Sequence, residues 1–389
     1  MGIYLDHAAT TYTDDKVLEK MLPYFSQTFG NASSLHDFGR IAEKGVRTAR
    51  EQVAKVLGAN PGEIYFTSGG TESDNWAIKG AAKVAGKGHI ITTPVEHHAV
   101  LDTCKSLEAE GFEVTYLSVD KFGQVSADDV EKAIREDTFL ISIMFANNEV
   151  GTIMPIKQIG QVAKKHGVLF HTDAVQAVGH VPIDVEEMNI DMLSLSAHKF
   201  YGPKGVGAMY LRSGVKIDRF IHGGGQEKGR RASTLNTPGI VGLGAAIELA
   251  AQNMQEEYEH ESELAARLKN GLLKLPRTLL NGHEQDRLPG NVNISFEGIE
   301  AEALLLHLDL DGIAVSTGSA CSSGSTSPSY VLNSMGRSIE QARAAVRFTV
   351  GRRNTKAEID EVIEKTKGIV KRLRDISPLF ADKGEKKYV

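Results

Sequence analysis

A lysine that directly follows a short apolar run is the first residue of this sequence with a clear chemical role. Residues Met192–Leu195 have the length and composition of a buried strand, and Ser196, His198 and Lys199 follow before a glycine-rich turn. A lysine amine that loses hydration at such a place becomes nucleophilic, as a Schiff-base lysine requires. Ser196 and His198 carry hydrogen-bond donors for a phosphate group. The alternative is an ordinary exposed lysine in a loop.

The second candidate is Cys321, in the middle of a segment of small polar residues. Residues 316–327 read STGSACSSGSTS, a composition that buries nothing apolar, so we expect a mobile loop. The five or six residues on each side of Cys321, if extended, would let the thiol reach up to about 20 Å. A free exposed thiol is a chemical liability, which favours a function over an incidental cysteine. Cys104 lies on an apolar helical segment and is interpreted as a small buried hydrophobe.

Polar side chains also follow the other predicted strands. A glycine-rich turn after residues 63–67 contains Gly70 and Thr71 and leads into a helix, and the free N–H groups and dipole of a helix start bind anions. Thr71 as a simple helix cap is the alternative. Since ligands gather at the carboxyl ends of parallel strands, the residues at the later strand ends are candidates too: His97, Asn148, Asp173 and Gln176.

The elements that must position these residues alternate between strands and helices. Strands are predicted at 63–67, 89–93, 113–118, 139–145, 168–171, 192–195 and 201–211, with helices at 38–57, 74–84, 100–109, 127–134 and 157–166. Several of the strands are continuously apolar, which predicts an α/β fold with a mostly parallel sheet covered by helices on both faces.

The pattern changes after a long predicted helix over 237–275. The alternation in 292–296 predicts a half-exposed antiparallel sheet, accompanied by helices over 302–310 and 356–374. We therefore predict a large domain of residues 15–259. A smaller α+β domain would contain residues 1–14 and 260–389 and carry the Cys321 loop.

Composition excludes several classes of function. The 389 residues have a formal net charge of −6 and no evident basic face, which argues against direct nucleic-acid binding. No apolar run approaches the roughly 20 residues that span a bilayer, so no membrane partner is expected. Two cysteines make no disulfide framework, and the start lacks signal-peptide features. We therefore expect a cytoplasmic protein.

Seven longer motifs occur in one order along the chain: GGTESDN, ANNEVG, HTDAVQ, SAHKFYGPKGVG, GGGQEKG, STGSACSSG and RFTVGR. Together they resemble the NifS/IscS cysteine desulfurases, pyridoxal-phosphate (PLP) enzymes of the aminotransferase class V family. The resemblance implies a PLP-dependent transferase of fold type I that converts L-cysteine to L-alanine. The sulfur would pass to Cys321 as a persulfide for iron–sulfur cluster biogenesis, thio-cofactors or tRNA thiolation.

The resemblance also implies partners. They are a second copy of the chain in a homodimer and a sulfur acceptor, either an IscU- or NifU-like scaffold or a tRNA-thiolation enzyme. It implies no intrinsic metal, although Cys321 would be a transient ligand of a nascent iron–sulfur cluster. The tail after Phe380 lacks the sequence by which IscS proteins dock their scaffold, so the acceptor stays open.

Each site residue receives an implied role from the same resemblance. Lys199 holds the cofactor and moves protons, Asp173 pairs with its pyridine nitrogen, and Gln176 binds its ring hydroxyl. His97 stacks on the ring, and transfer of the thiol proton is its second implied role. The remaining contacts fall into two groups: Gly70, Thr71, Ser196, His198 and the partner subunit's Thr234 around the phosphate, and Asn148 and Arg347 on the substrate carboxylate, with Asn148 also touching the cofactor.

Two departures and three alternatives accompany this interpretation. Ala32 stands where the family usually has proline, and Ser233 stands where it usually has glycine. A selenocysteine lyase or another class V aminotransferase remains an alternative, although an aminotransferase has no need of a loop cysteine. A non-enzymatic sulfur-relay platform is more remote, because Lys199 and Asp173 are both present.

Overall fold

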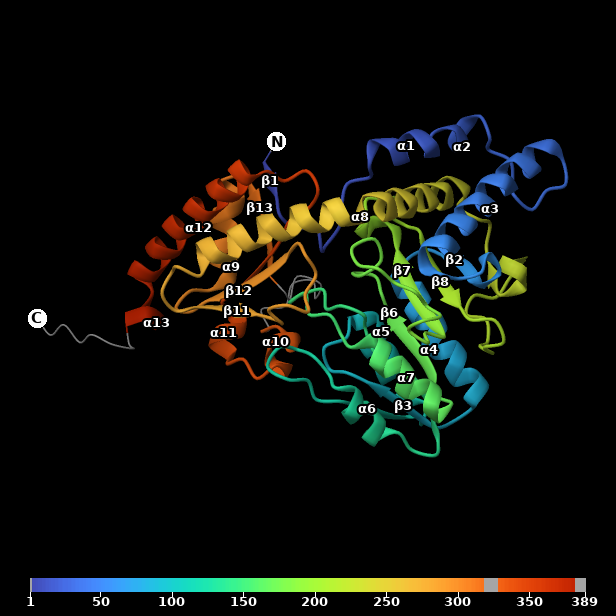
Figure 1. Ribbon diagram of the computed structural model, residues 1–389, viewed down its shortest axis with the longest axis horizontal. Coiled ribbons are helices and arrows are strands. Elements are labelled where there is room, and N and C mark those ends of the chain that lie inside the picture. Colours follow the sequence, from blue (N-terminus) through green and yellow to red (C-terminus); the bar gives the residue numbers. More distant parts are fainter. Residues whose placement is uncertain (1, 318–327, 382–389) are drawn as a thin grey trace, which may run out of the picture.

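A seven-stranded sheet forms the centre of the larger of two lobes (Figure 1). The computed structural model describes residues 2–317 and 328–381. In spatial order the strands are β2 (Ile64–Thr67), β8 (Gly207–Leu211), β7 (Met192–Ser196), β6 (Leu169–Asp173), β5 (Thr138–Ser142), β3 (His89–Thr92) and β4 (Glu113–Tyr116). Strand β8 runs in the opposite direction to the other six, which are all parallel to one another, so the predicted mostly parallel sheet is confirmed.

Helices cover both faces of this sheet, as the apolar strands predict. One face packs against α4 (Gly70–Ala85) and α5 (His98–Ala109), and the core there contains Trp76 and Leu107. The other face packs against α3 (Asp37–Leu57), α7 (Ile156–His166) and the first half of α8 (Thr237–Leu272), with α6 (Ala127–Ala133) beside α7. Cys104 lies in the α4–α5 core with no exposed surface, which confirms it as a small buried hydrophobe, and burial raises the pKa of its thiol to about 12.

Helix α8 is unbroken and connects the two lobes (Figure 1). Asn236 caps its start by accepting from the Gly239 N–H, and Pro238 occupies the first turn, where its missing N–H costs no hydrogen bond. Leu243 in the first half packs into the core of the large lobe, and Leu268 in the second half packs into the core of the small lobe.

The small lobe contains a four-stranded antiparallel sheet in the order β11 (Thr278–Asn281), β12 (Asn291–Phe296), β15 (Ala345–Thr349) and β14 (Ser316–Thr317). Its apolar face packs against α9 (Ala301–Leu310), α12 (Lys356–Ile376) and α8. The predicted half-exposed character is wrong for β12, because all six of its residues are buried. Asn293 on the polar face donates to the Glu149 carbonyl, so the large lobe covers that face.

The N-terminal segment joins both lobes. Strand β1 (Ile3–Tyr4) pairs in parallel with β13 (Ile313–Ala314), and the chain then runs past the sheet to α1 (Asp15–Met21) and α2 (Pro23–Ser26). The shorter elements are η1 (Pro61–Glu63), η2 (Ala197–Lys199), β9 (Gly225–Gln226), η3 (Glu227–Gly229), β10 (Arg231–Ala232), α10 (Tyr330–Ser334), α11 (Ile339–Arg343) and α13 (Pro378–Ala381).

The predicted limits of the two domains, at residues 14/15 and 259/260, stay a prediction. Some hydrophobic contacts cross them. Val331 and Leu332 of α10 pack into the core of the large lobe, although they lie beyond residue 260. Across residues 2–317 and 328–381, no helix is both long and apolar enough to cross a membrane.

Candidate active site

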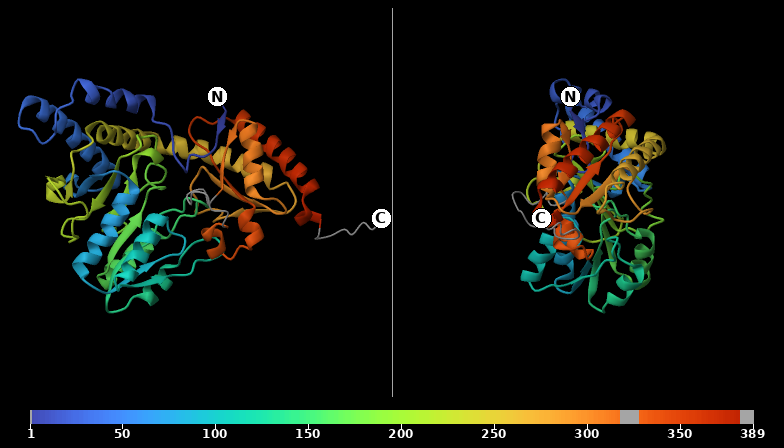
Figure 2. Two further views of the ribbon diagram at one scale, coloured as in Figure 1. Left: turned by 180° about the vertical axis from the view of Figure 1, so that it is seen from behind. Right: turned by 90° about the vertical axis from the view of Figure 1, so that its left-hand side faces the viewer.

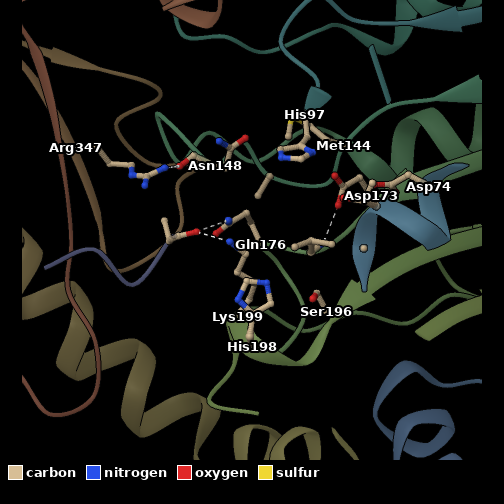
Figure 3. A pocket seen from close by; sticks show the side chains of 15 residues that line it. Asp74, His97, Met144, Asn148, Asp173, Gln176, Ser196, His198, Lys199 and Arg347 are labelled. Atoms are coloured by element: carbon tan, nitrogen blue, oxygen red, sulfur yellow. Dashed lines mark hydrogen bonds between the residues drawn. The ribbon is translucent and has the colours of Figure 1, made fainter. Parts of the chain in front are cut away.

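A cavity of about 230 Å³ lies at the carboxyl ends of the central strands, where the small lobe meets the sheet (Figure 3). Of the site residues predicted from sequence, it is lined by Gly70, Thr71, His97, Asn148, Asp173, Gln176, Ser196, His198, Lys199 and Arg347. They follow β2, β3, β5, β6 and β7, with Arg347 added from β15. Parallel strands place their carboxyl ends at one edge, and this brings residues 277 positions apart into one site.

Lys199 ends the single 3₁₀ turn that follows β7, and its amine points into the cavity rather than into bulk solvent (Figure 3). The Nζ donates to the carbonyls of Ala8, at 2.6 Å, and Ala9, at 2.8 Å. The Ala8 carbonyl also accepts from the Gln176 side chain at 3.0 Å. The N-terminal segment therefore fixes Lys199 and Gln176, two of the four side chains that the family resemblance associates with the cofactor ring.

Asp173 is the last residue of β6 and is 5 % exposed. Its Oδ1 accepts from the Val175 N–H at 2.9 Å. Burial raises the pKa of this carboxyl, while the nearby His97, the Val175 N–H and the Lys199 amine act in the opposite direction. A buried acid with such partners can hold a negative charge against a cationic ligand group.

Two histidines of the cavity are neutral at pH 7. His97 caps α5, where its Nδ1 accepts from the Ala99 N–H at 3.1 Å, so the ring proton sits on Nε2. Burial lowers its pKa. His198 is 3.0 Å from the Thr10 hydroxyl through Nδ1, and burial lowers its pKa to about 4. Neutral rings of this kind can stack on an aromatic ligand or donate a hydrogen bond.

Helix α4 begins at Gly70, four residues earlier than predicted, so Gly70 and Thr71 belong to its first turn. Gly69 precedes the helix and has no side chain to cap it. A Cβ on Gly70 would lie 2.5 Å from Cγ2 of Val175, so a larger residue would force the turn away from the sheet. The helix start remains open to an anion, and the buried Ser196 lies beside it at the end of β7.

Arg347 is 2 % exposed and reaches the opposite end of the cavity from Asp173 (Figure 3). One terminal nitrogen donates to the Asn148 carbonyl and the other to Asp6 Oδ1, each at 2.9 Å. Its Nε and the side-chain Oδ1 of Asn148 are buried without a hydrogen-bond partner in the described part of the chain. Buried polar atoms seldom lack partners, so these two point to a ligand.

Sequence reasoning missed three acids around the cavity, of which Asp74 and Glu96 are buried and Asp6 is half-buried. Asp74 lines it, Asp6 pairs with Arg347, and Glu96 accepts from the Met144 N–H beneath His97. Burial raises the pKa of Glu96 to about 8. For Asp74 a signal existed, because it lies four residues after Gly70 and a helix places such residues on one face. No signal in the sequence marks the other two.

Cys321 lies outside the residues that the structure describes. The described residues on either side of its segment are fixed near the cavity. Ser316 of β14 pairs with Arg347, the Ser329 hydroxyl donates to Glu149 at 2.6 Å, and the Tyr330 hydroxyl donates to the Glu96 carbonyl at 2.7 Å. Both flanks of the segment are therefore held at the cavity. Ser316 contacts the lining residue Arg347, and the other flank contacts Glu149 and Glu96, the sequence neighbours of Asn148 and His97.

Thr234 is exposed and is not among the residues that line the cavity of its own chain. Its neighbour Ser233, found where the family usually has glycine, adopts a φ of 85°. This left-handed conformation crowds the Cβ of any residue other than glycine, at a cost of about 1–2 kcal/mol.

We therefore expect Ser233→Gly to raise Tm by about 1–2 °C. The free energy gained by relieving the backbone strain exceeds the extra conformational entropy cost of fixing a glycine on folding. Differential scanning calorimetry at one protein concentration measures this. Ser106→Gly is the control, because Ser106 lies in helix α5, where glycine is unfavourable and Tm should fall. A lower Tm for Ser233→Gly would contradict the strain.

Comparison with known proteins identifies relatives along the whole chain. The family model of aminotransferase class-V matches residues 3–362. The chain is 57 % identical over 385 residues to a cysteine desulfurase IscS of Clostridium botulinum, covering 98 % of this chain and 97 % of that protein. It is 56 % identical to the cysteine desulfurase IscS of Methanosarcina thermophila, with coverages of 97 % and 94 %.

Solved structures of similar proteins superimpose on this chain over most of its length. A NifS-like protein superimposes with a TM-score of 0.90 at 42 % identity, covering 96 % of this chain and all of that one. A structure described as SspA in complex with cysteine superimposes with a TM-score of 0.81 at 42 % identity, covering 90 % of this chain and 99 % of that one.

Proposed function

Because the chain belongs to the aminotransferase class-V family and is a PLP-dependent cysteine desulfurase, we propose that the cavity around Lys199 is its active site. The observation that carries this assignment is the placement of one amine, one buried acid and one buried arginine in a single cavity. Lys199, Asp173 and Arg347 come from β7, β6 and β15, and each matches a different part of the chemistry.

The residues present fit the cofactor. The open start of α4, with Gly70 and Thr71, offers N–H groups to a phosphate, and Ser196 and His198 add donors beside it. Asp173 supplies a carboxylate for a pyridine nitrogen, and the neutral His97 supplies a ring for stacking. When bound, pyridoxal phosphate withdraws the electron pair that is left after a proton is removed from the substrate Cα.

Lys199 is assigned two tasks, which are holding the cofactor covalently and moving the Cα proton. Its Nζ already lies within hydrogen-bond distance of two carbonyls, so the amine is oriented rather than spread over many rotamers. Asp173 keeps a negative charge opposite, and Gln176, bonded to the Ala8 carbonyl, is assigned to the ring hydroxyl. His97 is assigned to stacking, with proton transfer to or from the thiol at Nε2 as a second task.

Arg347 and Asn148 are assigned to the substrate carboxylate. The unpartnered Nε of Arg347 and Oδ1 of Asn148 both lie in this part of the cavity, and a guanidinium fork fits a carboxylate better than an ammonium group does. The Asp6 carboxylate accepts a hydrogen bond from Arg347 in the same way that a substrate carboxylate would.

We expect Arg347→Lys to raise KM for L-cysteine by about 10–100-fold, the worth of a charged hydrogen bond, with a smaller effect on kcat. Steady-state assays over a range of L-cysteine concentrations measure both constants. Arg353→Lys is the matched control, because Arg353 is largely exposed and pairs with Asp15 at the surface. An unchanged KM in Arg347→Lys would contradict the assignment.

Cys321 is assigned as the acceptor of sulfur. Its thiolate attacks the sulfur of the bound substrate, the Cβ–S bond breaks, and an S–S bond forms on the enzyme. L-cysteine and the enzyme thiol thereby become L-alanine and an enzyme persulfide, with no external oxidant or reductant. Cys321 is four residues from Thr317, so the covalent chain limits their Cα separation to about 14 Å.

A homodimer is proposed on two grounds. Large apolar side chains are exposed along α1, α2 and the start of α3, at the outer edge of the large lobe drawn in blue (Figure 2): Leu18, Leu22, Phe25, Phe29, Leu35, Phe38 and Ile41. Such a patch is typical of an interface. Thr234 is also exposed, as a residue that reaches a partner's phosphate site must be. Sedimentation equilibrium tests this, and a monomer at micromolar concentration would contradict it.

The acceptor of the persulfide sulfur is proposed to be an IscU- or NifU-like scaffold or a tRNA-thiolation enzyme in a reducing cytoplasm. The two cysteines support that compartment, since Cys104 is a free buried thiol and Cys321 must stay reduced to react. Capture of proteins that acquire sulfur from the wild type but not from Cys321→Ala would identify the acceptor. Sulfur transfer that persists with Cys321→Ala would contradict the route.

The activity is tested by mixing the protein with L-cysteine and dithiothreitol and measuring sulfide and alanine. We expect one alanine for each sulfide, because the dithiol reduces the persulfide and regenerates the thiol. Formation of mercaptopyruvate without sulfide would favour an aminotransferase. Faster turnover of selenocysteine than of cysteine would favour a selenocysteine lyase.

A further inference from the structure

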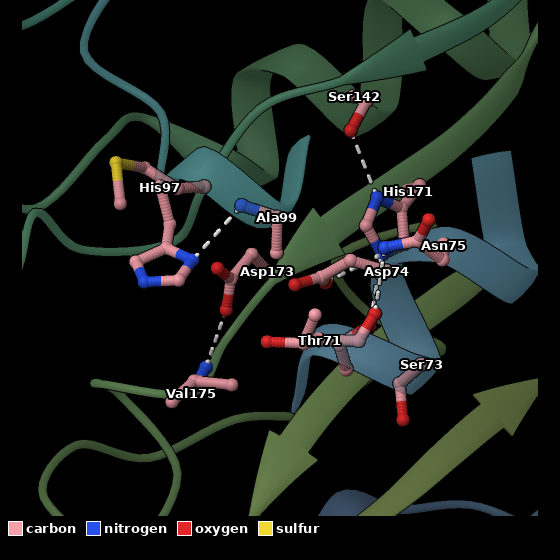
Figure 4. A network of polar contacts seen from close by, with 12 residues as sticks. Thr71, Ser73, Asp74, Asn75, His97, Ala99, Ser142, His171, Asp173 and Val175 are labelled. Atoms are coloured by element: carbon pink, nitrogen blue, oxygen red, sulfur yellow. Dashed lines mark hydrogen bonds and ion pairs between the residues drawn. The ribbon is translucent and has the colours of Figure 1, made fainter. Parts of the chain in front are cut away.

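Two carboxylic acids lie side by side at the floor of the cavity, although the family resemblance assigns a role to only one of them. Asp173 ends β6, and Asp74 comes from the second turn of α4 (Figure 4). Asp74 is 1 % exposed and lines the same cavity. Its Oδ1 has no hydrogen-bond partner among the described residues.

The groups around Asp74 on its far side are neutral. Its Oδ1 lies 3.6 Å from His171 Nε2, which is also 3.1 Å from the Ser194 hydroxyl. His171 Nδ1 is 2.9 Å from the Ser142 hydroxyl. His171 is completely buried, and burial lowers its pKa to about 3, so it carries no charge at pH 7.

The charged groups that act on Asp74 are themselves acids. Asp173 and Glu96 both disfavour a negative charge on it, and the Ser194 hydroxyl is the group that favours one. Asp173, in contrast, has the Val175 N–H, His97 and Lys199 to favour its ionised form. Burial raises the pKa of both acids, and the pKa of Asp74 lies well above its ordinary value.

Two adjacent buried carboxyls resist ionising together near pH 7, because each charge raises the free energy of the other. The proton must stay on the acid with fewer partners. We propose that Asp74 is a positioning residue that remains a neutral carboxylic acid, so that the floor of the cavity carries one negative charge, on Asp173. This inference rests on the proposed function only in its consequence, which is that the cofactor ring meets a single ionised acid.

Infrared spectroscopy of the full chain without cofactor, labelled with ¹³C at aspartate side-chain carboxyls, locates the proton directly. We expect a protonated-carboxyl band at pH 7 that disappears in Asp74→Asn. Asp129→Asn is the control, because Asp129 is exposed, hydrogen bonds from Ser126 and Lys132 lower the pKa of its carboxyl, and its loss should leave the band unchanged. A band that is absent from the wild type, or that survives in Asp74→Asn, would overturn the proposal.

A second measurement keeps Asp74 intact. In Asp173→Asn the opposing charge is gone, so the band of Asp74 should titrate at a pH lower by about one unit or more. A midpoint that does not move would show that the two acids are not coupled. Both infrared measurements stand whether or not the chain binds PLP, so they can fail independently of the proposed function.

The consequence for the cofactor is measured by titrating the variants with PLP and following its visible absorption. Asp74→Asn keeps a neutral side chain with a hydrogen-bond donor. The Kd for PLP should therefore stay within about threefold of wild type, and the pH midpoint of the visible absorption band of bound PLP should not shift. Asp74→Ala removes the donor and should weaken binding about tenfold. If Asp74→Asn behaves like Asp74→Ala, the wild-type residue is charged and the proposal fails.

Discussion

Replacing Lys199 by alanine should lower the rate of alanine formation from L-cysteine by at least about 10⁴-fold, the upper range of a single general acid–base group. The loss exceeds that of an ordinary binding residue because the variant lacks both the attachment point of the cofactor and the group that moves the Cα proton. The wild-type amine is oriented by the Ala8 and Ala9 carbonyls, and alanine removes that donor from both, although Gln176 still donates to Ala8.

Lys204→Ala is the matched control for this measurement. Lys204 belongs to the same glycine-rich segment and donates to the Thr11 carbonyl of the same N-terminal segment, but it does not line the cavity. We expect its activity to stay close to wild type. Comparable rates for Lys199→Ala and Lys204→Ala would show that Lys199 has no chemical role.

Replacing Cys321 by alanine should separate cofactor chemistry from sulfur transfer. The variant should bind PLP and show the visible absorption of the wild type, because no described contact of the cavity is altered. Sulfide release should fall by at least about 10³-fold, since loss of a nucleophile in other enzymes costs more than this.

Cys104→Ala controls for the loss of a thiol as such. Cys104 is buried between α4 and α5, away from the cavity, so its variant should lose a little stability and keep its activity. Full-rate desulfuration by Cys321→Ala would contradict the assignment of the nucleophile. Loss of activity in Cys104→Ala alone would move that role to the other cysteine.

Much of the large lobe follows from its apolar pattern. Strand β7 and helix α3 were predictable because a short continuous apolar run and an amphipathic repeat each have one structural solution at that length. Nine of the ten predicted cavity residues follow for a related reason, since parallel strands deliver their carboxyl ends to one edge. Arg347, on the antiparallel strand β15, was implied only by the family resemblance. The start of α4 was predicted four residues too late, because GGTESDN has turn-favouring residues at positions that the helix includes.

The unpredicted features all depend on contacts between distant segments. The polar face of β12 reads as exposed in the sequence, but the large lobe covers it through Asn293 and Glu149, which are 144 residues apart. Asp6 meets Arg347 across 341 positions. Burial of Asp74 requires α4 to dock on β6 and β7, and no local pattern reports that docking.

The central claim is that the Lys199 amine holds the cofactor opposite the Asp173 carboxylate. Borohydride reduction of the protein saturated with PLP, followed by peptide mapping, tests it most directly, because reduction makes the covalent C–N link permanent. We predict one pyridoxyl group for each chain, attached to the peptide that contains residue 199, and none in Lys199→Ala. Label on another lysine, or no stable label, would contradict the account.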